Sequence, residues 1–157
     1  MTEKSMNTML SEAILVSLEE TYESVKGIYL DKGTSIFETL ATISAEEASK
    51  SISANCSCIA AHVAHMTYYN EILLQFARGE RPETDWQHIW NTVKSVTPEE
   101  WQTSQNNLRE SYQKVRELVS STTFENENMI QGAMGILMHN AYHLGEIRQA
   151  LCTIKQS

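Results

Sequence analysis

Two histidines lie four residues apart in the segment His139-Asn-Ala-Tyr-His143, which continues Leu-Gly-Glu-Ile-Arg. On a helix this spacing places both side chains on one face, one turn apart. Both imidazoles can then reach a single divalent cation, and neutral imidazole is the commonest metal ligand in proteins. The pair therefore predicts part of a metal site whose other ligands come from elsewhere in the chain.

Two more histidines, His62 and His65, lie in a second segment with helical periodicity. A wheel drawn at 100° per residue places both on the apolar arc of that helix, and it places His139 and His143 on an apolar stripe of theirs. Buried imidazoles cost free energy unless their nitrogens find partners, and one cation satisfies several of them together. The residues alone leave open which of His62 and His65 belongs to the site. The predicted arc contains Cys58, Ile59, His62, Val63, His65, Met66, Tyr69, Ile72, Leu73 and Phe76, with Ala60, Ala64, Thr67, Glu71, Gln75 and Arg78 facing outward.

Three histidines without a fourth protein ligand leave coordination positions open, as in a catalytic metal site. The chain contains neither His-Glu-x-x-His nor Glu-x-x-His, so a zincin protease and a ferritin-like di-iron centre are not expected. Imidazole ligands suit zinc, nickel, iron or copper. His88, between Trp86 and Trp90, is expected to lie outside the site.

Helical periodicity dominates the segments that must position these histidines. We predict long helices over about 5–26, 55–78, 97–119 and 125–154, and short ones opened by Ser35 and Ser44. The long connector between the second and third carries a short helix over 85–90 with Trp86 and Trp90. The pattern predicts an all-α four-helix bundle in a single domain, 1–157. Its first helix is expected to bury Met9, Ala13, Val16, Leu18 and Tyr22.

Composition restricts the class of partner. The 157 residues are 41% hydrophobic and 20% charged, with a net charge of −8. This charge argues against binding to nucleic acid or to an anionic membrane. The sequence has no signal-peptide pattern and no apolar run of the roughly 20 residues that span a bilayer. We therefore expect a cytoplasmic protein with reduced thiols at Cys56, Cys58 and Cys152.

The segment Ile59-Ala-Ala-His-Val-Ala-His65-Met, followed at a distance by His139-x-x-x-His143-x-Gly-Glu-Ile-Arg, resembles the DinB/YfiT-like superfamily of metal-dependent enzymes. The similarity extends over nearly the whole chain, including the four main helices and the crossover. It implies an up-down-down-up bundle, a homodimer, and a metal bound by three histidines. At matching positions the ligands are His65, His139 and His143, because His65 follows Ile59 by six residues. His62 is the alternative to His65.

The resemblance also implies a reaction class. The superfamily contains S-transferases that use bacillithiol or mycothiol, and a thiol-dependent maleylpyruvate isomerase. The expected activity is therefore a thiol S-transferase that joins a small-molecule thiol to an electrophilic substrate, with zinc or nickel as the metal. One alternative is a non-catalytic, stress-associated dimeric bundle whose histidines bind metal structurally, weakly or not at all. Another is a metal-stabilised dimer without turnover.

Residues near the histidines have two interpretations each. Glu146, three residues after His143, is placed to accept a hydrogen bond from a ligand imidazole, or to serve as a surface charge or a dimer contact.

Gly132, Gly135 and Gly145 each cost a helix about 1 kcal/mol relative to alanine. We expect close approach of another helix to offset that cost.

Overall fold

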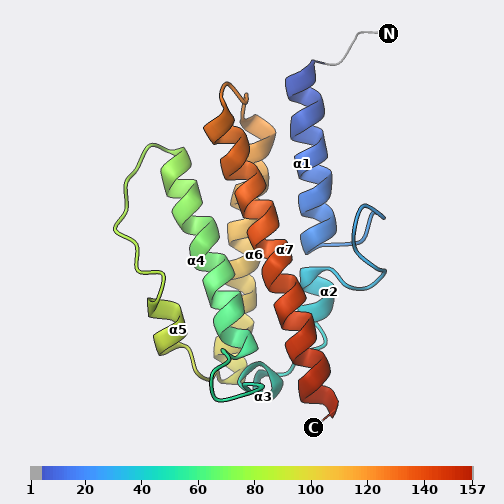
Figure 1. Ribbon diagram of the computed structural model, residues 1–157, viewed down its shortest axis with the longest axis vertical. Helices are drawn as coiled ribbons and strands as arrows, with labels where there is room; N and C mark the ends of the chain where they lie inside the picture. Colours follow the sequence, from blue (N-terminus) through green and yellow to red (C-terminus); the bar gives the residue numbers. More distant parts are fainter. Residues whose placement is uncertain (1–4, 157) are drawn as a thin grey trace.

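The computed structural model describes residues 5–156 and is all-helical over them, which confirms the predicted class. Figure 1 shows the seven helices of this part of the chain, with no strand among them. No helix within these residues is both long and apolar enough to cross a membrane. The helices are α1 (Met6–Tyr22), α2 (Ile36–Leu40), α3 (Ala45–Ala48), α4 (Ile59–Ala77), α5 (His88–Thr92), α6 (Pro98–Ser121) and α7 (Glu127–Gln156).

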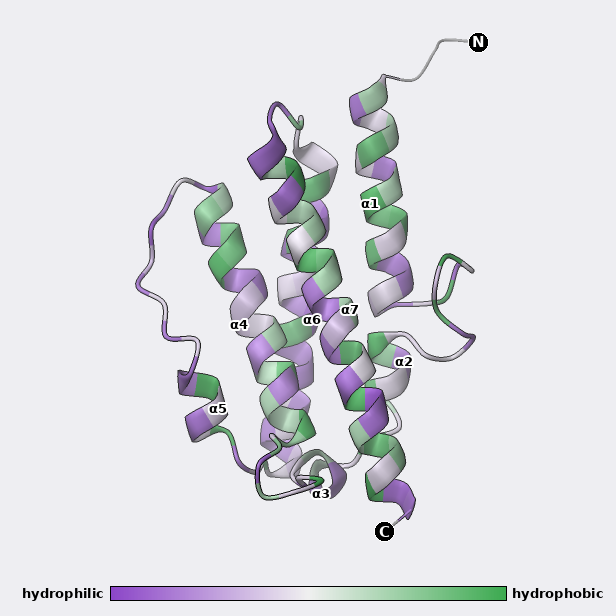
Figure 2. Cartoon of the chain, in the orientation of Figure 1, coloured by the Kyte–Doolittle hydropathy of each residue, from purple (hydrophilic) through white to green (hydrophobic). Residues whose placement is uncertain are grey.

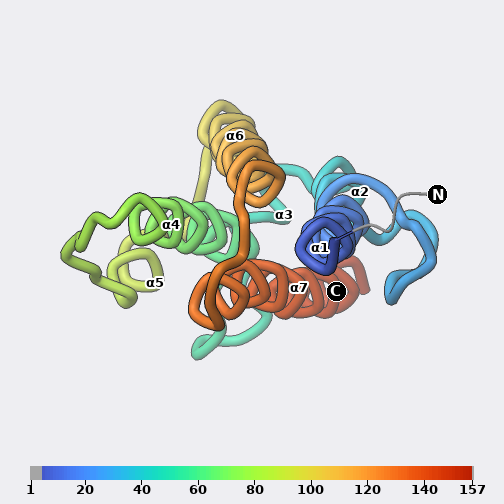
Figure 3. Tube along the Cα trace, turned by 90° about the horizontal axis from the view of Figure 1, so that it is seen from above, coloured from blue at the N-terminus to red at the C-terminus, as the bar shows by residue number. Residues whose placement is uncertain are grey.

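The four long helices surround one apolar core. Both α1 and α4 pack against α6 and α7, and the end-on view in Figure 3 shows α6 and α7 on opposite sides of the gap between α1 and α4. In Figure 1, α1 and α7 run in one direction while α4 and α6 run in the other. The largest side chains with almost no exposed surface in this core include Leu18, Tyr22, Met66, Tyr112, Leu144 and Ile147.

Capping side chains fix where three helices begin. The Ser5 side chain accepts the backbone N–H of Thr8 at the start of α1. Thr97 caps α6 in a capping box with Glu100, and Pro98 occupies the first turn, so the helix begins within one residue of the predicted start at about 97. Ser44 and Glu47 form the same arrangement around α3. These local hydrogen bonds agree with the starts of α1 and α6, which the sequence predicts to within one residue.

The first helix is shorter than predicted and buries a different stripe. It ends at Tyr22 instead of about residue 26, and Leu18 and Tyr22 are buried as expected. The prediction was wrong for Met9, Ala13 and Val16, which are exposed. The apolar stripe of α1 that packs against the core contains every fourth residue, namely Leu10, Ile14 and Leu18.

The loop after α1 is organised by one buried carboxylate. Glu20, with no exposed surface, accepts backbone N–H groups from Lys26, Ile28, Tyr29 and Leu30 at 2.6 to 3.1 Å. Because these amides turn toward Glu20, they are unavailable to continue the helix. The chain leaves α1 after Tyr22, before the predicted end at about residue 26.

The second long helix also starts later than predicted. It begins at Ile59, with Cys58 at the N-cap, instead of at about residue 55. Ala60, predicted to face outward, is 1% exposed because α3 and α6 both pack near this end of α4. Phe76, predicted to face inward, is 39% exposed at the other end of α4.

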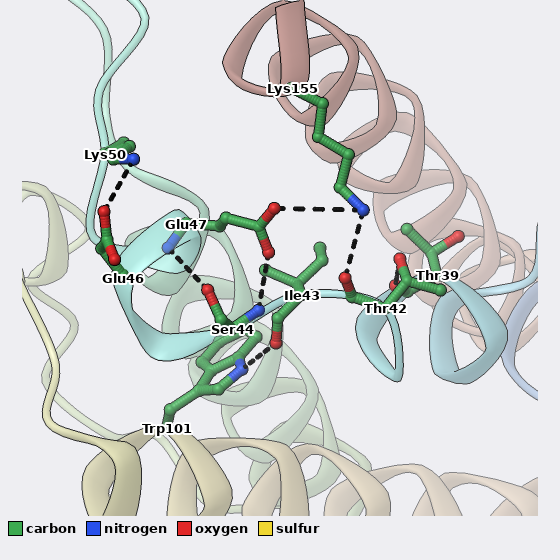
Figure 4. Close-up of polar contacts among 9 residues, drawn as sticks. All are labelled: Thr39, Thr42, Ile43, Ser44, Glu46, Glu47, Lys50, Trp101 and Lys155. Carbon is green, nitrogen blue, oxygen red and sulfur yellow. Dashed lines mark hydrogen bonds and ion pairs between the residues drawn. The ribbon is translucent and has the colours of Figure 1, made fainter. Parts of the chain in front are cut away.

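Segment 39–50, shown in Figure 4, contacts both the beginning of α6 and the end of α7. The Trp101 indole Nε1 donates to the Ile43 carbonyl at 2.8 Å. Lys155 Nζ donates to the Thr42 carbonyl at 3.3 Å and lies 3.9 Å from a Glu47 carboxylate oxygen. The short α3 therefore closes one end of the core.

A buried polar network takes one side chain from each long helix. Asn70 Nδ2 on α4 donates to the Tyr22 hydroxyl at 2.9 Å and to Ser111 Oγ at 3.1 Å. Asn140 Nδ2 on α7 donates to Asn70 Oδ1 at 2.9 Å. None of the four residues has exposed surface. Four helices are thus joined through Asn70.

The crossover from α4 to α6 contains the predicted short helix, which begins at His88. The Asp85 carboxylate accepts the N–H groups of Gln87 and His88, so the chain turns there first and Trp86 precedes the helix. The stretch before α5 is mostly hydrophilic in Figure 2. Trp90 lies within α5, as predicted.

Candidate metal centre

The structure brings His65 of α4 together with His139 and His143 of α7. Each offers one nitrogen, and these three atoms lie within 4.8 Å of one another. The ring centroids are 5.0 Å apart for His65 and His139, 5.0 Å for His65 and His143, and 4.5 Å for His139 and His143. The i,i+4 spacing on α7 and the packing of α4 against α7 produce this convergence.

Two nitrogens of this cluster are buried without a hydrogen-bond partner among the described residues. They are Nδ1 of His65 and Nε2 of His139. Leaving such a group unpaired costs about 1–3 kcal/mol. A bound cation would satisfy them, so these residues fit a metal site.

The cluster is held in the neutral form that binds metals. Burial, with the neighbouring His143 and His65, lowers the pKa of His139 to about 4. Burial, with His62 and His65, lowers the pKa of His143 to about 3. Burial is also the main reason that the pKa of His65 is below its ordinary value. At neutral pH the three imidazoles therefore keep lone pairs for a ligand.

His62 and Glu146 lie next to His143. Nδ1 of His62 is 3.1 Å from Nδ1 of His143, and Glu146 Oε2 is 2.7 Å from His143 Nδ1 and 3.4 Å from His62 Nδ1. His62, His143 and Glu146 therefore form a second group that could hold a metal ion. Both His62 and His65 face the interior, as the wheel predicted, and Glu146 lies beside His143.

Aromatic rings cover the histidines. Tyr69 stacks on His139 with ring centroids 3.7 Å apart. Trp90 lies 4.4 Å from His65 and 5.2 Å from His62, also between centroids. The sequence predicts Trp90 in a short helix but does not predict its contact with the site. The one sequence feature that indicates a fold of this segment back onto α4 is the position of Trp90 in a long crossover, four residues after Trp86.

A cavity of about 760 Å³ lies beside His62 and His143. It gives this side of the cluster access to a small molecule, and none of its lining residues is a lysine or arginine. Glu146 is its acidic group. The lining residues are Ile52, Asn55, Cys56, Ser57, His62, Trp90, Tyr142, His143, Gly145, Glu146, Gln149 and Ala150.

Other candidate residues lie as follows. His88 is exposed on α5 and belongs to neither histidine group, in agreement with the expectation. The cysteines are free: Cys56 is exposed and lines the cavity, Cys58 is buried, and Cys152 is exposed. Their thiols are therefore not joined in disulfides.

The expected reason for the glycines of α7 is wrong for two of them. A Cβ added at Gly132 or Gly145 would meet no heavy atom within 4 Å. At Gly135 it would lie 3.5 Å from the Tyr69 hydroxyl, an ordinary contact. Close approach of another helix therefore does not explain Gly132 or Gly145.

No family model matches this sequence, and neither a curated protein nor a solved structure matches it.

Proposed function

We propose that this chain is a metal-dependent enzyme whose divalent cation, zinc or nickel, is bound by His65, His139 and His143. The observation that carries the proposal is the convergence of three neutral imidazoles that include buried nitrogens without hydrogen-bond partners. Three protein ligands leave coordination positions for water or substrate. The proposal includes the up-down-down-up four-helix arrangement, which the helix directions in Figure 1 support, because α4 and α6 run parallel to each other and opposite to α1 and α7.

The proposed reaction is the transfer of a small-molecule thiol of the bacillithiol type to an electrophilic substrate. A bound metal supplies the means to hold a thiol as its thiolate. The cavity beside His143 provides room for the substrates. Stacking of Tyr69 on His139 and the contact of Trp90 with His65 would restrict the orientations of these two imidazoles.

Metal binding is tested by elemental analysis of protein purified without chelator. We expect bound zinc or nickel in the wild-type chain and at least a tenfold loss of affinity in His65→Ala, His139→Ala and His143→Ala. His88→Ala is the matched control, because His88 is exposed and outside the cluster. Loss of metal in His88→Ala, or its retention in all three ligand variants, would contradict the assignment.

Tryptophan fluorescence gives an independent measurement. Nickel in the cluster is expected to quench Trp90, whose ring lies 4.4 Å from that of His65. The ring of Trp86 lies 6.4 Å from that of His65, so Trp90→Phe should remove part of the quenching, and the double variant Trp86→Phe, Trp90→Phe should remove most of it. Equal quenching in wild type and in the double variant would place the ion elsewhere.

Turnover is tested separately. Metal-loaded protein is expected to consume bacillithiol or a simpler thiol in the presence of an electrophile such as a haloalkane, and His143→Ala should not. A protein that binds metal tightly and consumes no thiol with any electrophile would instead be a metal-stabilised bundle. We also propose a homodimer, which sedimentation equilibrium would distinguish from a monomer.

A further inference from the structure

We propose that His62, His143 and Glu146 bind a second divalent cation beside the first, with His143 shared between the two. This inference rests on the proposed function, because it presumes that His65, His139 and His143 hold the first ion. It adds the identity of a second ligand set and explains why a fourth histidine and a carboxylate lie within the same cluster.

The three donor atoms converge from two helices. His143 and Glu146 are three residues apart on α7, so they share one face of that helix. His62 faces them from α4. The separations of 2.7, 3.1 and 3.4 Å among His62 Nδ1, His143 Nδ1 and Glu146 Oε2 are short enough for one small cation to contact all three atoms.

Hydrogen bonding does not fully account for this convergence. Glu146 Oε2 is buried and has no hydrogen bond among the described residues, although it lies 2.7 Å from His143 Nδ1. The Glu146 side chain is 36% exposed, but Oε2 itself is buried against the two imidazole nitrogens. Two ring nitrogens 3.1 Å apart also require at least one of them to present a lone pair. A cation would satisfy the lone pairs of all three side chains.

The donor chemistry of this set differs from that of the first. Two imidazoles and one carboxylate form a set that binds divalent first-row metals with open coordination positions. The first set is made of imidazoles alone. All three residues of the second set line the cavity of about 760 Å³, so an ion there can also hold water or substrate.

His143 can serve both sets because an imidazole ring has two nitrogens. Its Nδ1 is the atom near His62 and Glu146. If Nε2 contacts the other ion, the ring acts as an imidazolate and its last N–H proton goes to solvent. Removing His143 should therefore abolish both sites, whereas removing any other ligand should abolish one.

The experiment measures Co²⁺ stoichiometry by equilibrium dialysis, followed by elemental analysis and by d–d absorption. We expect two ions per chain in wild type and in the control His88→Ala. We expect one in His62→Ala and Glu146→Gln, one in His65→Ala and His139→Ala, and none in His143→Ala. Circular dichroism checks that each variant is folded, and His62→Gln replaces His62→Ala if the latter is not.

The outcomes separate this inference from the proposed function. One ion in wild type that is retained in His62→Ala and lost in His65→Ala would overturn the second site and leave the first intact. Two ions in Glu146→Gln, bound as tightly as in wild type, would remove Glu146 from the second ligand set and overturn the set as proposed. One ion that is lost in His62→Ala and Glu146→Gln but retained in His65→Ala would support the second set and contradict the proposed ligands. No bound Co²⁺ in wild type would overturn both.

Discussion

Glu20 shows how a single side chain can organise a loop. Its carboxylate accepts backbone N–H groups from four residues between Lys26 and Leu30. Burial acts to raise its pKa, but the amides of Ile28, Tyr29, Leu30 and Lys26 together lower it to about 2 from an ordinary 4.5. The ionised form is thus strongly preferred in the folded protein.

This preference predicts a pH-dependent stability. Because the folded-state pKa is lower than the unfolded one, the contribution of Glu20 is complete above pH 4.5 and is lost as the pH falls toward 2. Glu20→Gln is expected to lower the free energy of unfolding at pH 7 by about 1.5–3 kcal/mol, because charged hydrogen bonds are lost. Urea unfolding at pH 7 and at pH 3 measures both effects.

Glu110→Gln is the control, since Glu110 is exposed on α6. Its difference from wild type should be within about 0.5 kcal/mol at pH 7. The difference between wild type and Glu20→Gln should shrink as the pH is lowered. An unchanged difference at pH 3 would contradict the role given to the Glu20 carboxylate.

The sequence predicted the surroundings of some residues and not of others. Helical spacing and an apolar surrounding, both visible in a sequence, predicted that His139 and His143 share a site with His62 or His65, and only the family resemblance favoured His65 over His62. The contacts of Glu20 and Trp90 were not predicted, because they depend on how a loop folds back against a helix. Glu20 resembles any acidic residue of an amphipathic helix until its backbone partners, six to ten residues further on, are known.

At the scale of elements, α7 contains glycines in a regular helix. Gly132 has open space where a Cβ would be. Gly79, by contrast, has a φ of +83°, a conformation that other residues avoid. The same substitution should therefore have opposite effects at the two positions.

Gly132→Ala is expected to raise the free energy of unfolding by about 1 kcal/mol, because alanine loses less backbone entropy in a helix. Gly79→Ala should lower it by about 1 kcal/mol, because of strain at positive φ. Thermal and urea unfolding measure both. Destabilisation by Gly132→Ala would show that the helix needs glycine there for a reason other than packing.

Helix existence and type were predictable for all four long helices, and the start of α6 was predicted to within one residue. Boundaries set by tertiary contacts were not. The start of α4 depends on the loop that precedes Cys58, and the end of α1 depends on Glu20. The exposed side of α1 was misjudged because Met9, Ala13 and Val16 form an apolar series of their own.

At the scale of the whole molecule, the hydrogen bonds of Asn70 connect α4 with α1, α6 and α7. Asn70→Ala would leave Tyr22, Ser111 and Asn140 without these partners. We expect a loss of about 3 kcal/mol in the free energy of unfolding. Urea denaturation of the chelated protein measures this loss without a contribution from bound metal.

Asn107→Ala is the matched control, because it makes the same change at an exposed position of α6. Both variants gain the better helix propensity of alanine, so their difference reports the network. Equal stabilities for the two variants would show that the buried amide contributes nothing.

The predicted all-α class needed only periodicity and composition. The way in which the long helices pack around the core had to come from the structure, since apolar stripes alone allow several arrangements. Asn70 and Asn140 carried no signal on the helical wheel, because an amide inside a core becomes interpretable only when its partners are known.

The Asn70–Asn140 pair also restricts the alignment of α7 along α4 to a single one. Apolar surfaces tolerate sliding, but moving α7 along α4 by one helical turn, about 5.4 Å, would separate the two amides inside the core. Polar pairs of this kind are known to specify alignment between helices. We expect a variant with leucine at both positions to remain compact while sampling more than one alignment. His65 would then meet His139 and His143 in only a fraction of molecules.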